Sequence, residues 1–291
     1  MEFQTKVDIQ SSSWKILPCE KMLFLGSCFA DNIGNRFREE QFRAIVNPFG
    51  VMYNPASILH SVQELLDSSH EIEGVESYED RIPQVAIFTL GTNHVYILKE
   101  TREIVDNCKK RPQHLFVERA LSVSECYQYL DEAVSLLRSA NPEIKIILTV
   151  SPIRYRKYGY HGSQLSKATL QLAADQLVQH YVSEENDNSV CYFPAYEIVN
   201  DELRDYRFYK PDMLHPSEQT VEYIYERFAE AYFSEDTRKF LAEWKPIKEA
   251  LGHKPFHPES EEYKKFMDKT MLKVSMLSKK YPKFAYQKII K

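Results

Sequence analysis

Short runs of consecutive apolar residues recur along the chain, separated by longer stretches in which apolar positions follow a helical period. The runs are rich in β-branched or aromatic side chains and stop near Gly, Pro or Ser, as buried strands do. They cover residues 22–26, 44–49, 85–91, 144–150 and 190–199. We therefore predict that these runs form the strands of one mainly parallel sheet.

The stretches between the runs predict helices, because apolar residues recur at the i, i+3, i+4 and i+7 positions that share one helix face. Three such sets are Leu130, Ala133, Val134 and Leu137; Leu170, Ala173, Ala174 and Leu177; and Val221, Ile224, Tyr225 and Phe228, which follow Pro216. Right-handed crossovers between parallel strands place helices on both faces of a sheet. The predicted fold class is α/β, a three-layer α/β/α sandwich.

The pattern changes near Ser234, where strand-like runs disappear and charged, helix-compatible segments take over. We predict an α/β domain over residues 20–234 and a C-terminal helical extension over residues 235–291. The extension either packs on the domain or forms an interface with another chain. A homo-oligomer formed through its helices is one of these alternatives.

The composition of the chain argues against two classes of binding partner. The 291 residues include 43% hydrophobic and 27% charged side chains, which suffices for a globular core without disulfides or metals. The formal charge of −5 gives no basic footprint for nucleic acid. No apolar run approaches the roughly 20 residues that a bilayer span requires. We expect neither a nucleic-acid nor a membrane partner.

Cysteine usage and the N-terminal segment bear on the compartment. The five cysteines are odd in number and form no CxxC pair, so the pattern predicts neither a disulfide framework nor a zinc knuckle. The first residues lack the charged and apolar regions of a signal peptide. We expect reduced thiols and a cytoplasmic location.

The candidate catalytic residues lie where the predicted strands end. The ligand crevice of a parallel sheet lies beyond these ends. The first run leads into Gly26-Ser27-Cys28, and a helix is predicted to begin near Asp31. A nucleophile at such a turn lies at the positive end of a helix, which favours a thiolate and helps to stabilise an oxyanion. The alternative is a tight glycine turn followed by a core cysteine.

Asn93 follows the third run, and its side-chain amide is placed to donate to a developing oxyanion. Gly50, which closes the second run, could add a backbone N–H to the same hole. The alternative for Asn93 is an ordinary turn residue, since Asn adopts turns readily.

Asp212 and His215 lie three residues apart in a loop before the last amphipathic helix of the domain. The carboxylate can orient the imidazole so that its other nitrogen faces a nucleophile. Metal binding is the alternative, but no HxH or HExxH motif exists to complete a ligand set. We therefore expect no metal.

The order of these motifs resembles the SGNH hydrolase superfamily, whose blocks carry Ser, Gly, Asn and His in this succession. More closely, the chain resembles the GSCFA domain family, named after the pentapeptide at residues 26–30. The resemblance extends from about Leu23 to about Phe233 and includes GSCFADNIG, NPFGVMYNPASI, FTLGTNHVY and TVSPIRY. It implies an SGNH hydrolase-like, flavodoxin-like arrangement.

By this resemblance, Gly50 and Asn93 take the oxyanion-hole positions. Asp212 and His215 take the acid–base positions. The first block departs from the superfamily pattern, because Gly-Asp-Ser is replaced by Gly-Ser-Cys.

Aligned without a gap, Cys28 occupies the nucleophile position, whereas a shift of one residue gives that position to Ser27.

Two further residues are candidates for substrate binding. Arg154, after the fourth run, could hold an anionic or carbonyl group, or be an exposed loop arginine. His161 precedes a predicted helix and either lines the cleft or caps the helix.

The resemblance implies a hydrolase that removes a small acyl group from an ester, such as an O-acetylated carbohydrate, by a Cys/Ser-His-Asp mechanism. Two alternatives stay open. One is an acyltransferase that uses a Cys thioester. The other is a non-catalytic SGNH-fold protein that binds a carbohydrate or a protein. The chain has no P-loop and no dinucleotide fingerprint, so we expect no cofactor.

Overall fold

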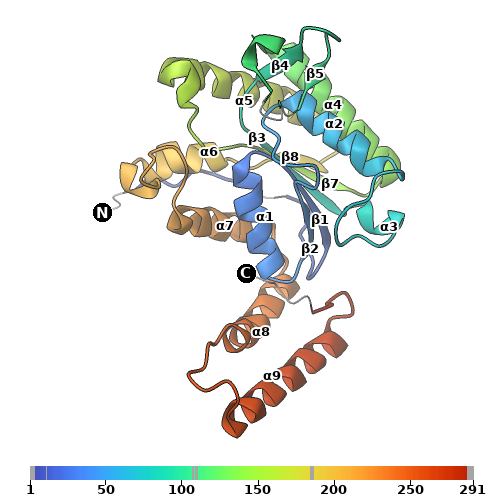
Figure 1. Cartoon of the computed structure of the whole chain (residues 1–291), viewed down its shortest axis with the longest axis vertical. Helices are drawn as coiled ribbons and strands as arrows, with labels where there is room; N and C mark the ends of the chain where they lie inside the picture. Colours follow the sequence, from blue (N-terminus) through green and yellow to red (C-terminus); the bar gives the residue numbers. More distant parts are fainter. Residues whose placement is uncertain (1–3, 11, 107, 109–110, 184–186, 287–291) are drawn as a thin grey trace.

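The computed structural model of the protein describes residues 4–10, 12–106, 108, 111–183 and 187–286. A five-stranded parallel sheet with the order β2-β1-β3-β7-β8 lies at its centre (Figure 1). Its strands are β1 (Lys21–Gly26), β2 (Arg43–Val46), β3 (Val85–Leu90), β7 (Lys145–Val150) and β8 (Val190–Tyr192). This is the flavodoxin-like strand order, in which ligands bind where the order reverses, between β1 and β3.

Helices cover both faces of the sheet, which confirms the predicted α/β/α sandwich (Figure 1). On one face, α1 (Cys28–Glu39) and α7 (Glu218–Tyr232) bury an aromatic-rich layer against β1 and β3. On the other face, α2 (Pro55–Leu66), α4 (Val123–Ala140) and α5 (Gly159–Ser183) bury mainly aliphatic side chains. The α4 and α5 stripes predicted from periodicity are buried in this second layer.

A small antiparallel sheet with the order β5-β4-β6 follows β3 and was not predicted. Its strands are β4 (His94–Leu98), β5 (Ile104–Val105) and β6 (Phe116–Ala120). Four of the five residues of β6 are exposed, and β5 has only two residues. These strands therefore lack the continuous apolar run by which a buried strand is recognised.

Two predicted strands are shorter than their apolar runs. The chain leaves β8 at Tyr192, and Pro194 precedes the short helix α6 (Ala195–Glu197) and a π-helical turn, η3 (Ile198–Leu203). In the same way, β2 ends at Val46, two residues before Pro48. Proline has no N–H for the ladder, so it ends both strands although the apolar pattern continues.

The remaining short elements connect the main ones. They are α3 (Tyr78–Arg81), η1 (Gln113–Leu115), η2 (Arg156–Tyr158) and η4 (Tyr206–Phe208). None of the helices in the described part of the chain is long and apolar enough to span a membrane.

The C-terminal helices α8 (Glu235–Leu251) and α9 (Glu261–Lys280) form a hairpin beside the end of α1 (Figure 1). Trp244 of α8 is buried, and its indole N–H donates to the carbonyl of Glu39 at 3.0 Å. Cys19, which precedes β1, belongs to the same apolar cluster as Trp244. The hairpin therefore packs on the α/β layers through α1 and the N-terminal segment.

Candidate active site

The turn between β1 and α1 is shaped by Gly26 and Ser27. Gly26 has φ +136°, and a Cβ there would lie 2.2 Å from the carbonyl oxygen of Thr89, so only glycine fits. Ser27 is 1% exposed and is the N-cap of α1, where its Oγ accepts from the N–H of Phe29 at 3.2 Å. Its own N–H donates to the Thr89 carbonyl at 3.1 Å. The Ser27 side chain is therefore engaged in holding the turn.

Cys28 is the first residue of α1, and its side chain is only partly buried. Its Sγ lies 3.6 Å from the hydroxyl of Tyr53. As the first helical residue, Cys28 also has a backbone N–H without an intrahelical acceptor. The thiol thus combines access, a polar neighbour and the positive end of a helix.

Tyr53 was not among the predicted site residues; it stands 25 residues from Cys28, in the NPFGVMYNPASI segment. Nothing in its local pattern marks it, because the contact arises only when β1 and the loop before α2 are brought together. The carbonyl of Tyr53 also accepts from the N–H groups of Gly91 and Thr92, at 2.9 and 2.8 Å. Tyr53 therefore links the first and third sequence blocks.

The two expected oxyanion-hole residues make other contacts. The N–H of Gly50 donates to the carbonyl of Asn47 at 2.9 Å, and Gly50 has φ +100° in an exposed turn. The Nδ2 of buried Asn93 donates to the carbonyl of Leu121 at 2.6 Å. Its Oδ1 is buried without a hydrogen-bond partner among the described residues. One amide proton of Asn93 remains beyond the Leu121 bond.

Asp212 and His215 form an oriented pair. Asp212 Oδ2 lies 2.6 Å from Nδ1 of His215. The other carboxylate oxygen accepts from the N–H groups of His215 and Leu214, at 3.0 and 2.8 Å. These backbone bonds, together with the imidazole, lower the pKa of Asp212 to about 2. The carboxylate stays ionised near neutral pH, and Nε2 of the imidazole is the nitrogen left for other groups.

Arg154 holds the loop that carries this pair. Its backbone N–H donates to the carbonyl of Leu214 at 3.1 Å, and its guanidinium donates to the carbonyl of Met213 at 3.0 Å. The guanidinium also lies over the ring of Tyr160, 4.2 Å from the centroid. Its described contacts are therefore with the loop and with aromatic rings.

His161 lies in the first turn of α5, and its side chain is exposed. Its imidazole has no hydrogen bond or ion pair within the ranges that the structure describes, and it does not line the groove beside α1. Among the described residues, no hydrogen bond or ion pair joins His161 to Cys28 or to the Asp212–His215 pair, and none joins Cys28 to that pair.

A buried lysine was also overlooked by sequence analysis. Lys167 of α5 is 2% exposed, and its Nζ donates to the carbonyls of Gly91 and Ser151, both at 2.7 Å. These carbonyls directly follow β3 and β7. Burial lowers the pKa of Lys167 to about 7. Periodicity could not single it out, because its two acceptors come from distant strands.

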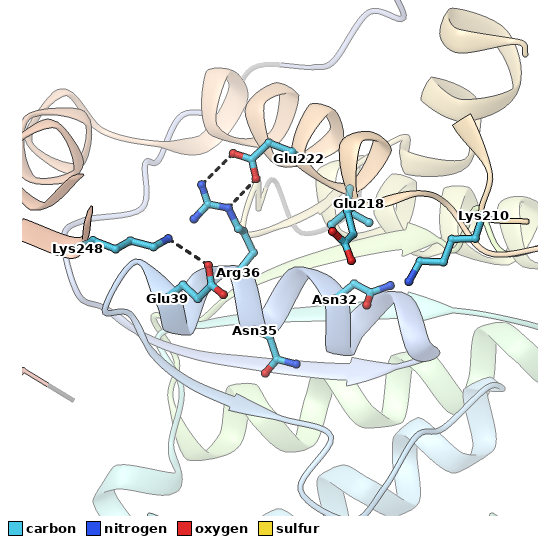
Figure 2. A pocket seen from close by; sticks show the side chains of 9 residues that line it. Asn32, Asn35, Arg36, Glu39, Lys210, Glu218, Glu222 and Lys248 are labelled. Atoms are coloured by element: carbon cyan, nitrogen blue, oxygen red, sulfur yellow. Dashed lines mark hydrogen bonds and ion pairs between the residues drawn. The ribbon is translucent and has the colours of Figure 1, made fainter. Parts of the chain in front are cut away.

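A groove of about 460 Å³ lies between α1 and α7 (Figure 2). Its α1 side includes Asn32, which lies one helical turn beyond Cys28 and therefore on the same helix face. Its other side includes Lys210, whose backbone N–H donates to the carbonyl of His215 at 2.7 Å. The groove is thus bordered by the elements that carry Cys28 and His215.

The far end of the groove is neutralised by ion pairs. Arg36 donates to the carboxylate of Glu222 at 2.7 and 2.8 Å, and Lys248 lies 3.1 Å from Glu39 (Figure 2). At the near end, Lys210 and Glu218 have no ion pair among the described residues, and Asn32 lies between them (Figure 2). These polar side chains are therefore available to a ligand. No cluster of metal-ligating side chains occurs in the described part of the chain.

Several solved structures are similar to the chain at low sequence identity. The chain is similar to a GDSL-like lipase from Bacteroides thetaiotaomicron, with 14% identity, a TM-score of 0.41, and coverage of 72% of this chain and 86% of that one. An acetyl esterase variant solved with acetate gives 12% identity, a TM-score of 0.41, and coverage of 78% and 99%. A carbohydrate esterase family 3 protein from Talaromyces cellulolyticus gives 10% identity, a TM-score of 0.37, and coverage of 77% and 98%.

A comparison with curated proteins finds no match. A model described as the C-terminal domain of GSCFA domain proteins matches residues 244–291. The model of the GSCFA family matches residues 21–82 and 75–228, which is well over half of the chain. The chain therefore belongs to the GSCFA family.

Proposed function

We propose that the protein is an ester hydrolase in which Cys28 is the nucleophile, His215 the general base and Asp212 the residue that orients it. One observation carries the proposal. The Asp212–His215 pair, with 2.6 Å between Oδ2 and Nδ1, lies on the loop that follows Lys210, and Lys210 lines the same groove as Asn32, one helical turn after Cys28. Covalent acyl chemistry requires a nucleophile and a base that a carboxylate orients, and the proposal is that the two meet at this groove.

The choice of Cys28 over Ser27 rests on exposure and on hydrogen bonding. Ser27 is 1% exposed, and its hydroxyl caps α1. Cys28 is partly exposed at the helix N-terminus. Attack by Ser27 Oγ would compete with its cap bond, whereas the Cys28 side chain takes no part in the cap.

The reaction follows from these roles. Nε2 of His215 takes the thiol proton, and Sγ of Cys28 forms a bond to the acyl carbonyl carbon. The carbonyl electron pair moves onto oxygen, and the donors that we assign to it are the backbone N–H of Cys28 and the second amide proton of Asn93. Collapse breaks the C–O bond of the ester, and the leaving alkoxide takes the proton from His215. Water, activated by His215, then hydrolyses the thioester.

The substrate we propose is a small acyl ester, such as an O-acetylated carbohydrate. The near end of the groove offers an ammonium, a carboxylate and an amide from Lys210, Glu218 and Asn32. Such a mixed set both donates to and accepts from hydroxyl groups, so it suits an uncharged polyhydroxylated leaving group. The neutralised far end adds no net charge that would select an ionic ligand.

Hydrolysis of p-nitrophenyl acetate by four proteins tests the proposal: wild type, Cys28→Ala, Ser27→Ala and His215→Ala. We expect the rate to collapse in Cys28→Ala and His215→Ala and to persist in Ser27→Ala. Equal background rates in all four proteins would mean that the protein is not an esterase, and would favour a non-catalytic binding protein.

Acyl transfer is a second candidate, favoured by the cysteine at the nucleophile position. A thioester intermediate reacts with acceptors other than water. Partitioning of the acetyl group between water and an added sugar alcohol distinguishes the two outcomes. Transfer that exceeds hydrolysis at millimolar acceptor would identify a transferase.

A further inference from the structure

The oxyanion that forms when Cys28 attacks a carbonyl group requires preorganised donors close to the position of the developing charge. Two of the groups expected to donate there are already engaged in full or in part. The N–H of Gly50 donates to Asn47, and one amide proton of Asn93 is used by Leu121. A further donor near the sulfur would therefore strengthen the site.

Tyr53 places a hydroxyl at this position. It lies 3.6 Å from Sγ of Cys28, and this is its only hydrogen-bonding contact within the described ranges. The carbonyl carbon of a substrate bonds to Sγ, so its oxygen becomes negative within the same few ångströms of the sulfur. The hydroxyl already lies in this region.

The backbone around Tyr53 is fixed on both sides. The N–H of Met52 donates to the carbonyl of Gly26 at 2.9 Å, which ties the segment to the β1–α1 turn. The carbonyl of Tyr53 accepts from Gly91 and Thr92 after β3. The hydroxyl therefore does not need to be repositioned during the reaction, which is what makes a donor effective.

The hydroxyl also keeps its proton. Burial, followed by the contact with Cys28, raises the pKa of Tyr53 above the ordinary value of 10. Tyr53 is therefore a neutral donor at neutral pH. Tyr155 packs its ring edge-on against Tyr53, with 5.8 Å between centroids, and covers this ring.

We infer that Tyr53 is a catalytic residue whose hydroxyl donates a hydrogen bond to the oxyanion formed when Cys28 attacks an acyl ester. The inference rests on the proposed function. Tyr53 gains and loses no proton in this step, since the thiol proton goes to His215 and the negative charge develops on the former carbonyl oxygen.

The test compares the rate of ester hydrolysis with the rate of alkylation at Cys28. Tyr53→Phe removes the hydroxyl and keeps the ring, so we expect kcat for p-nitrophenyl acetate to fall about 100-fold with little change in KM. Alkylation of Cys28 by iodoacetamide forms no oxyanion and should change little. Tyr78→Phe, the same chemical change at an exposed ring of α3, is the matched control and should hydrolyse at the wild-type rate. Thermal unfolding verifies that each variant is folded.

Three results would overturn the inference. If Tyr53→Phe keeps the wild-type kcat, the hydroxyl is not a catalytic group, although hydrolysis at Cys28 stands. If hydrolysis and alkylation fall by the same factor, Tyr53 acts on the thiol and not on the oxyanion. If the wild type is no faster than Cys28→Ala, the proposed function fails and the inference fails with it.

Discussion

Ser27 and Cys28 are neighbours in the sequence, yet their side chains have different surroundings. Ser27 is buried and caps α1, whereas Cys28 reaches the hydroxyl of Tyr53. The sequence alone left the nucleophile open between these two residues, because a one-residue shift of the motif is invisible without coordinates. Burial and the cap therefore distinguish the two side chains.

Ser27→Ala tests this division. Loss of the N-cap should lower the free energy of unfolding by about 1 kcal/mol, as measured by urea denaturation. Hydrolysis should stay close to the wild-type rate. Ser122→Ala, which removes the N-cap of α4, is the matched control with a similar loss of stability. A folded Ser27→Ala protein without activity would instead assign the nucleophile to Ser27.

At the scale of the element, Lys167 connects α5 to the ends of β3 and β7. Its two bonds at 2.7 Å hold the carbonyls of Gly91 and Ser151. Gly91 leads into Asn93, and Ser151 leads into Arg154, which holds the loop of the Asp212–His215 pair. Lys167 thereby positions two of the segments that surround the site.

The buried ammonium makes stability depend on pH. The ordinary pKa of lysine is 10.5 and burial lowers that of Lys167 to about 7, so between these values the unfolded chain binds more protons. Stability should therefore rise with pH across this window, by at most about 1.4 kcal/mol per unit.

Urea denaturation of the wild type and of Lys167→Met at pH 7.5 and 8.5 measures this contribution. The wild type should gain roughly 1 kcal/mol more than the variant between the two pH values. Lys239→Met, at a lysine whose side chain is 62% exposed, should follow the wild type. Parallel pH dependences of the wild type and Lys167→Met would contradict the assigned shift.

The sequence predicted the elements whose patterns are strong. The five apolar runs became the central sheet, and the stripes became α4, α5 and α7. The small antiparallel sheet was not predicted, because its strands are short and most residues of β6 are exposed. The order of motifs pointed to Cys28, Asp212 and His215, since these follow strand ends or precede a helix. Tyr53 and Lys167 act through contacts between distant segments, which no local pattern encodes.

At the scale of the whole molecule, the hairpin of α8 and α9 packs on the three-layer sandwich beside α1. Trp244 of α8 is 2% exposed and binds the carbonyl of Glu39. Lys248 of the same helix lines the far end of the groove. The hairpin therefore contributes to the end of the groove at which Lys248 pairs with Glu39.

Trp244→Ala should show how strongly the hairpin is held. Removal of a buried indole should lower the free energy of unfolding by about 3–5 kcal/mol in urea. Leu272→Ala on α9, where the side chain is 58% exposed, should change it by less than about 0.5 kcal/mol. A Trp244→Ala protein as stable as the wild type would show that the hairpin does not depend on this contact.

The central claim is that Cys28 carries the acyl group. The most direct measurement is rapid quenching of the protein with p-nitrophenyl acetate in acid, followed by peptide mass spectrometry. We expect an acetyl group on Cys28 in the wild type and in Ser27→Ala, and none on that peptide in Cys28→Ala or His215→Ala. An acetyl group on Ser27, or equal labelling of exposed side chains in all four proteins, would contradict the account.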